Sequence, residues 1–220
     1  MHICIFSVIP YQHLSQRPQK LALEFIRQGH RVSYINPPWN VLSLFVRNQL
    51  KLGEGKQNNI PKDIEIIPIP LYGIPKIKRT RLPINLSDEQ VSNYLDKRLY
   101  NKLSNDDINV AIVQDPRMEG FVKAESFDCV CYDCLDDIGV FNDWGFDCFR
   151  QHQKSLIEKC SVIFYTADAL AEDLNNNFKP SVPMVNILNG VDYNWFISQS
   201  GVKIKSKKKL LNLSGFLAVW

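Results

Sequence analysis

Residues 3–36 read ICIFSVIPYQHLSQRPQKLALEFIRQGHRVSYIN, and the architecture of the chain follows from them. The run Ile3–Ile9 is almost continuously apolar, which is typical of a strand buried on both faces of a parallel sheet. An amphipathic helix is predicted next, with Pro18 near its first turn and Gly29 at its end. The segment Arg31–Asn36 is the second strand. Strand, helix and strand in so short a stretch form a βαβ unit, which predicts a parallel sheet with a right-handed crossover.

The same alternation continues along the chain and predicts a Rossmann-like, doubly wound α/β domain with about seven parallel strands. The further strands are expected at residues 64–69, 110–113, 129–132, 162–165 and 185–188, and the further helices at 41–52, 87–103, 146–159 and 168–176. Ser87 and Gln90 have the spacing of a capping box at the start of one of these helices. Residues 1–192 therefore form one domain. Residues 193–209 have the composition of a linker, and residues 210–220 that of the first strand of another Rossmann-like half.

The composition is that of a globular chain able to bury a core, with 45% apolar and 22% charged residues among 220. No run approaches the roughly 20 apolar residues that span a bilayer, and the start lacks a basic leader and a cleavage site, so we expect a cytoplasmic protein. The net charge of +3 divides into +8 over residues 1–104, −10 over 105–202 and +5 over 203–220. This division indicates a cleft with differently charged walls, a basic face toward lipid headgroups or phosphates, or solvated surface charge alone.

Six cysteines raise the question of a metal or disulfide framework. Cys129 and Cys131 alternate within a predicted strand, so they share one face and resemble small core residues. A structural zinc site would instead present paired ligands on turns, with a second pair elsewhere. We expect free buried thiols and no metal site, and disulfides least of all in a reducing cytosol.

Ligands of an open parallel sheet bind at the carboxyl ends of its strands, so the polar residues there are candidates for a site. Asp133, Asp136 and Asp137 bring three carboxylates together, and their mutual repulsion would raise at least one pKa if they are partly buried, as a general base requires. Helix capping and simple solvation are the alternatives, and a Mg²⁺ site is a weaker one. His13 and Arg17, near a helix N-terminus, could meet an anion. The remaining candidates are Gln16, Asp115, Arg117, Asn189 and Asp192.

Several separated strings coincide with one family. The strings Gln16-Arg17-Pro18-Gln19, Tyr132-Asp133 with Asp136-Asp137, and Asn189-Gly190-Val191-Asp192 together resemble the N-terminal half of GT-B glycosyltransferases, of the family 4-like kind that includes teichuronic acid and capsule-type transferases. Gly215-Phe216 with Trp220 resembles the opening strand and turn of the second domain of that family. No Gly-rich phosphate loop and no G-x-S-x-G elbow occurs, which argues against P-loop enzymes, dinucleotide-dependent dehydrogenases and a sugar-nucleotide epimerase.

The resemblance implies a two-domain enzyme of cell-surface polysaccharide synthesis, with an acceptor in the domain 1–192 and a nucleotide-sugar donor in a domain that starts at 210–220. It places Asp136 and Asp137 on the acceptor side, where we expect catalytic roles for them, and His13 is a further catalytic candidate from its place in the loop before a helix. Substrate-binding roles are expected for Gln16, Arg17, Asn189 and Asp192 from the resemblance, and for Asp115, Arg117 and Asp133 from their positions at the strand ends.

No cofactor and no nucleic acid is expected. The partners are the nucleotide-sugar, a saccharide or lipid-linked acceptor, and a separate chain if one supplies the donor domain. We expect the 220 residues to be inactive alone. The basic segment Lys76–Arg81 could rest on the inner face of an anionic membrane or be a solvated loop. The alternative function is a non-catalytic Rossmann-like binding module or the partner subunit of a split transferase.

Overall fold

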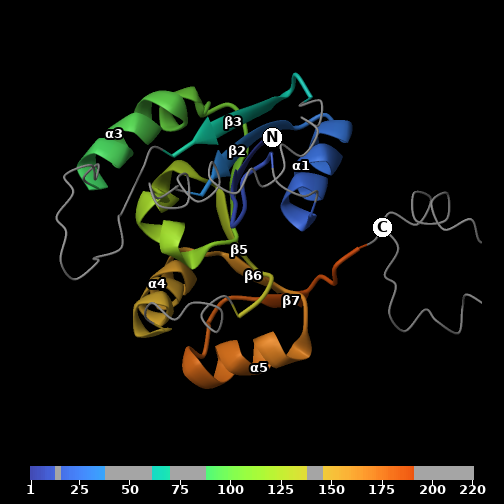
Figure 1. Ribbon diagram of the computed structural model, residues 1–220, viewed down its shortest axis with the longest axis vertical. Helices are drawn as coiled ribbons and strands as arrows, with labels where there is room; N and C mark the ends of the chain where they lie inside the picture. The colour runs from blue at the N-terminus through green and yellow to red at the C-terminus, as the bar shows by residue number, and fades with distance from the viewer. Residues whose placement is uncertain (13–15, 38–60, 70–87, 138–145, 191–220) are drawn as a thin grey trace, which may run out of the picture.

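The computed structural model describes residues 1–12, 16–37, 61–69, 88–137 and 146–190. These contain a sheet of seven strands, all parallel, in the order β3-β2-β1-β4-β5-β6-β7 (Figure 1). The strands are β1 His2–Phe6, β2 Arg31–Asn36, β3 Ile64–Pro68, β4 Asn109–Val113, β5 Cys129–Cys134, β6 Val162–Tyr165 and β7 Met184–Asn186. The predicted Rossmann-like parallel sheet is confirmed.

Helices cover both faces of the sheet. The α-helices are α1 Arg17–Arg27, α3 Asp88–Arg98, α4 Phe146–Lys159 and α5 Asp168–Asn177, and the 3₁₀-helices are η1 Tyr100–Lys102, η2 Pro116–Phe121 and η3 Ala124–Ser126. Helix α1 packs on one face, whereas α3, η2, α4 and α5 contribute to the core on the other. Right-handed crossovers require this arrangement, because the strand order turns back after β3 and the connections then run over the opposite face. The domain is therefore doubly wound.

The core consists of two layers, one on each face of the sheet. Phe6, Val113 and Tyr132 alternate with Ile5 and Ile112 along neighbouring strands, and each set packs on its own side. The first layer receives side chains that are fully buried from the helices and their connections, namely Leu95, Leu99, Met118 and Leu156. Burial of one such side chain contributes about 1.5–3 kcal/mol. These two layers hold the carboxyl ends of the strands in fixed positions.

Several predicted boundaries were wrong, for identifiable reasons. Strand β1 ends at Phe6 and not at Ile9, because the Ser7 hydroxyl lies 2.6 Å from the Tyr34 hydroxyl and accepts a hydrogen bond from the backbone of Ile9, which turns the chain. The helix predicted over 87–103 ends at Arg98 and continues as the tighter η1.

One described element was not predicted, and two predicted features lie outside the described residues. Helix η2 was not predicted, although Pro116 at its start and Asp115 before it are ordinary signals of one. The helix predicted at 41–52 and Ser87 of the capping box lie outside the described residues. None of the described helices is long and apolar enough to cross a membrane.

Candidate functional site

The string Gln16–Gln19 shapes the N-terminus of α1. Gln16 is the N-cap residue, and its N–H donates to Oε1 of Gln19 at 3.1 Å. The side-chain amide of Gln19, which is buried, donates to the carbonyl of Pro10 at 3.1 Å. Pro18 is buried in the first turn, where its missing N–H costs no hydrogen bond. The start of α1 is thus tied to the loop after β1, and this sets the direction in which Arg17 leaves the helix.

Arg17 joins the ends of two distant strands. Its Nε and Nη2 donate to the two carboxylate oxygens of Asp133 at 3.2 and 2.9 Å. Its Nη1 donates to the carbonyls of Ile187 and Leu188, both at 3.1 Å, and to Oδ1 of Asn189 at 3.4 Å. The planar guanidinium suits this two-pronged contact with a carboxylate. One side chain therefore links the carboxyl end of β5 to the segment that follows β7.

Asp133 lies at the centre of this network and is 1% exposed. In addition to Arg17, it accepts a hydrogen bond from Nε2 of Gln114 at 2.9 Å. Gln114 follows β4 directly, and its place at the end of a strand marks it as a polar candidate together with Asp115 and Arg117. Its Oε1 is buried without a hydrogen-bond partner among the described residues. We name Arg17, Gln114, Asp133 and Asn189 the Arg17 cluster.

Asp115 and Arg117 lie at the carboxyl end of β4, as predicted, and pair with each other. Asp115 is 1% exposed and caps η2 by accepting from the N–H of Arg117 at 3.0 Å. The Arg117 guanidinium closes on the same carboxylate at 2.8 and 2.7 Å. The pKa of Arg117 is raised, because these hydrogen bonds outweigh the effect of burial. This geometry stabilises the turn into η2 and leaves Arg117 half exposed at the rim.

The three clustered carboxylates do not act as one group. Asp133 contacts Arg17, Asp136 is exposed, and Asp137 contacts Arg150, with Nη2 of the arginine 3.4 Å from Oδ2. Arg150, in α4, also donates to the carboxylate of Asp173, in α5, at 2.6 and 3.0 Å. The same guanidinium therefore links α4, α5 and Asp137. Separate arginines thus neutralise two of the three aspartates, and Asp136 is the one that faces solvent.

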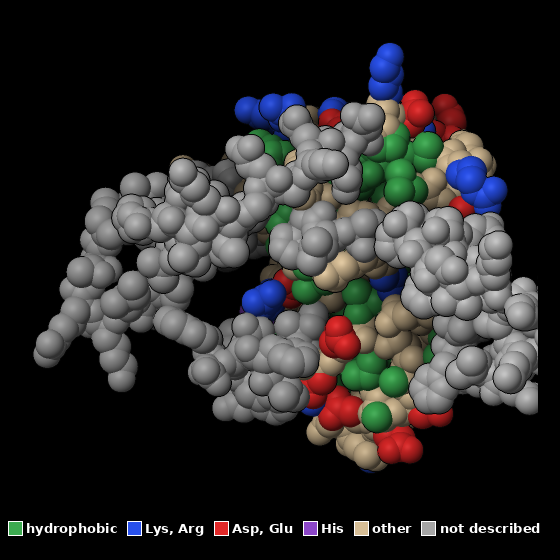
Figure 2. All heavy atoms as spheres, turned by 45° about the vertical axis from the view of Figure 1, so that its right-hand side comes forward, with side chains coloured by type: hydrophobic (Ala, Val, Ile, Leu, Met, Phe, Trp, Pro, Cys, Tyr) green, Lys and Arg blue, Asp and Glu red, His purple; other side chains and the backbone are tan. Residues whose placement is uncertain are grey.

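Two of the predicted site residues, His13 and Asp192, lie outside the described residues, as do the basic segment 76–81 and residues 191–220. Among the described side chains, Figure 2 shows acidic groups gathered over the lower part of the molecule, at the height of α5. Asp168 at the start of α5 and Glu172 within it are exposed. The acidic character that the sequence gives to residues 105–202 is therefore visible on this surface.

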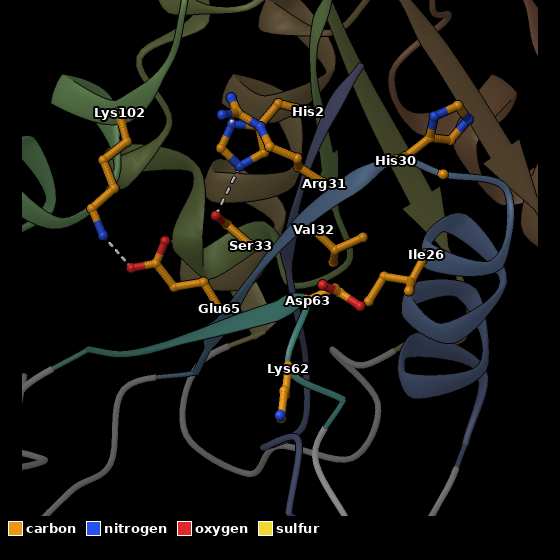
Figure 3. Close-up of a pocket in the computed structure, with 11 residues that line it drawn as sticks. His2, Ile26, His30, Arg31, Val32, Ser33, Lys62, Asp63, Glu65 and Lys102 are labelled. Carbon is orange, nitrogen blue, oxygen red and sulfur yellow. Dashed lines mark hydrogen bonds and ion pairs between the residues drawn. The ribbon is translucent and has the colours of Figure 1, made fainter.

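A hollow of about 730 Å³ lies at the opposite, amino-terminal edge of β1, β2 and β3 (Figure 3). His2 is one of the residues that line it. Its Nε2 atom is 2.9 Å from the Ser33 hydroxyl, and its Nδ1 atom is 3.2 Å from Nη2 of Arg31. Because arginine can only donate, Nδ1 accepts and Nε2 carries the proton. Burial, together with the charge of Arg31, lowers the pKa of His2. Within this hollow Lys102 pairs with Glu65. These groups largely satisfy one another, and parallel sheets bind ligands at the other edge, so we place the candidate site at the Arg17 cluster.

The fold and the Arg17 cluster define a Rossmann-like α/β domain with a polar, hydrogen-bonded centre at the carboxyl edge of its sheet. No protein-family model matches the chain, and no curated protein matches it.

Among solved structures, the crystal structure of Arabidopsis thaliana UGT89C1 is similar with 13% identity and a TM-score of 0.47, covering 84% of this chain and 49% of that one. The same protein complexed with quercetin gives 13% identity and a TM-score of 0.44, covering 80% of this chain and 45% of that one. The chain spans about half the length of these structures. A likeness of this size carries no argument about activity.

Proposed function

We propose that the chain is the acceptor-binding half of a GT-B glycosyltransferase, which moves a sugar from a nucleotide diphosphate donor to a saccharide or lipid-linked acceptor in cell-surface polysaccharide synthesis. One observation carries the proposal. The separated strings that resemble this family meet in space, because Arg17 of the first string binds Asp133 of the second and Asn189 of the third.

The position of the Arg17 cluster supports a ligand site. It lies where open α/β sheets bind their ligands, at the carboxyl ends of β4, β5 and β7. A buried ion pair is weak support for stability, since its desolvation offsets much of its attraction, so a role in fixing geometry is the better reason for it. Gln16 and Asn189 are exposed at the rim and carry amide groups that can donate to and accept from sugar hydroxyls.

Roles for the remaining groups follow from their exposure. Asp136 is the exposed carboxylate and is the candidate general base, with His13 as the alternative. Asp137, held by Arg150, positions the segment that carries Asp136. In this proposal residues 193–209 are the linker, residues 210–220 begin the donor domain, and the basic segment 76–81 approaches an anionic membrane.

A second candidate is a non-catalytic binding module or a partner subunit. One observation favours it: Asp115, Asp133 and Asp137 each pair with an arginine, and a paired carboxylate is a poor base. The two candidate functions differ in one requirement: a transferase needs a donor-binding domain for its activity, whereas a binding module does not.

The test is calorimetric titration with UDP and UDP-sugars of this chain and of a form extended by a donor-binding domain. The transferase proposal expects binding by the extended form only, and loss of sugar transfer but not of UDP binding in D136N. The matched control is D106N, an exposed aspartate before β4, which should retain transfer. Tight UDP binding by the 220 residues alone would place the nucleotide site in this half and overturn the domain assignment. UDP binding without transfer in the extended form would favour the binding module.

A further inference from the structure

The segment that follows β7, residues 187–190, has few attachments to the sheet. In the described part of the chain its backbone donates one hydrogen bond, from the N–H of Ile187 to the carbonyl of Tyr165 at 2.8 Å. Leu188, Asn189 and Gly190 are exposed. We name residues 187–190 the outgoing segment. Beyond Ile187, the strand ladder does not determine its course.

Arg17 supplies further attachments of the outgoing segment. Its Nη1 donates to the carbonyls of Ile187 and Leu188 and to Oδ1 of Asn189. Successive residues of an extended strand face opposite ways, so two consecutive carbonyls that share one donor fix a change in the course of the chain. Arg17 therefore holds the direction of the outgoing segment as well as its position.

The guanidinium is itself fixed from the other side. Its Nε and Nη2 donate to the buried carboxylate of Asp133 at the end of β5, and Gln114 at the end of β4 donates to the same carboxylate. A guanidinium is planar, so its three nitrogens cannot turn independently. The place of Nη1 is thus set by the centre of the sheet and not by the edge strand β7.

An ion pair with a purely structural purpose needs only Nε and Nη2. The contacts of Nη1 go instead to two neutral carbonyls and one amide, which carry no charge that requires compensation. Their effect is to connect the outgoing segment to Asp133. This third nitrogen is the reason to assign Arg17 a role beyond the stability of the domain.

We propose that Arg17 is a positioning residue that fixes the course of the outgoing segment relative to the carboxyl ends of β4 and β5. The inference rests on the proposed function, in which this segment leads to the linker and the donor domain. Domains close about a few residues at the ends of elements, and group transfer requires the reacting atoms about 3–3.5 Å apart. An outgoing segment held by Arg17 gives the donor domain a fixed pivot beside the acceptor site.

The variant R17K separates the two functions of the guanidinium. A lysine presents one ammonium on a flexible stem, which can meet Asp133 but cannot also hold two carbonyls in the geometry of a planar fork. The measurement is amide hydrogen exchange of the full 220-residue chain by NMR. It compares the rate at Ile187 with the rate at Ile163, whose N–H donates to the carbonyl of Pro183 at the other end of the β6–β7 pair. A loss of global stability alone accelerates both amides.

The ratio of the Ile187 rate to the Ile163 rate should rise about tenfold in R17K, as expected for the loss of a hydrogen bond from a charged donor. R17M/D133N removes the guanidinium without leaving a buried charge and should raise the ratio in the same way. The matched control R27K, on the exposed side of α1, should leave it unchanged. An unchanged ratio in either folded Arg17 variant overturns the proposal.

A second readout tests the use of this anchor. In the form extended by a donor-binding domain, R17K should lower kcat about ten- to hundredfold and leave KM for the UDP-sugar within about twofold, because the donor contacts lie in the other domain. An unchanged kcat together with a raised exchange ratio would overturn the pivot. Exchange needs neither sugar nor nucleotide, so absence of transfer by the extended wild type would overturn the proposed function and leave the exchange test of Arg17 valid.

Discussion

Removal of the Arg17 guanidinium should destabilise the domain far more than loss of an ordinary surface charge. In R17M the carboxylate of Asp133 stays 1% exposed and loses its two charged hydrogen bonds, and among the described residues Gln114 is its remaining side-chain donor. Removal of one partner of a buried ion pair costs about 3–5 kcal/mol. Arg17 itself is 13% exposed, so water can reach part of the gap and the lower end, about 3 kcal/mol, is the better figure. For a domain of this size that lowers Tm by about 6–12 °C.

A second substitution should then partly restore stability. D133N removes the unpaired charge while its amide oxygen can still accept from Gln114, so R17M/D133N should unfold with a free energy about 1–2 kcal/mol higher than R17M alone. The control is R27M, because Arg27 is 76% exposed and, in the part of the chain that the structure describes, pairs with Glu24 one helical turn away and with no other acidic residue. Its effect should stay below about 1 kcal/mol.

Urea denaturation followed by circular dichroism measures all four proteins, and hydrogen exchange at the amide of Ile187, which bonds to the carbonyl of Tyr165, reports on the segment after β7. The reasoning is refuted if R17M changes the free energy of unfolding no more than R27M does. It is equally refuted if the double variant is less stable than R17M.

Three further outcomes are expected. Burial alone would raise the pKa of Glu119, but its hydrogen bonds, led by that from Lys159, outweigh this effect, and the pKa is lowered. The ionised group therefore stabilises the fold above its ordinary pKa, and this contribution is lost as the pH falls. In E119Q, the decrease of Tm between about pH 6 and pH 3 should be smaller than in the wild type. Burial lowers the pKa of His2, so the unfolded chain binds the proton first, and stability should fall as the pH drops below about 6.5; H2Q, which can still bond to Ser33, should flatten melts over that range. D115A removes the N-cap of η2 and should cost about 1–2 kcal/mol in urea unfolding, whereas D106A should be near neutral.

The sheet could be predicted because its information is local. The stretch Arg31–Asn36 and the helix Phe146–Lys159 agree with the structure residue for residue, since apolar period and strand length alone distinguish a buried strand from an amphipathic helix. The ends of β1 and α3 could not be predicted, because they depend on the Ser7–Tyr34 contact and on packing of the last helical turn. Local patterns carry no information about such contacts.

The candidate site divides in the same way. The sequence correctly predicted that Asp115, Asp133 and Asn189 lie at the carboxyl edge of the sheet, because the carboxyl ends of parallel strands meet at one edge. It could not show which charges pair. From the sequence, Asp133, Asp136 and Asp137 form one acidic group, but the alternation of side chains along β5 and the turn after it send them to different partners. Pairing of Arg17 with Asp133, 116 residues away, is a property of the folded register.

The string Gln16–Gln19 illustrates why a short motif can identify a long-range site. Gln19 is buried and bonds to the carbonyl of Pro10, so it fixes the loop before α1. Pro18 limits the backbone of the first turn. From this fixed first turn, Arg17 reaches Asp133 and the backbone beyond β7. Because Gln19 and Pro18 fix the turn that carries Arg17, a substitution at Gln19 should weaken the hydrogen bonds of Arg17, although Gln19 takes no part in them. A site that depends on such a chain of constraints is specified by four adjacent residues, although the groups that it joins lie in three distant parts of the sequence.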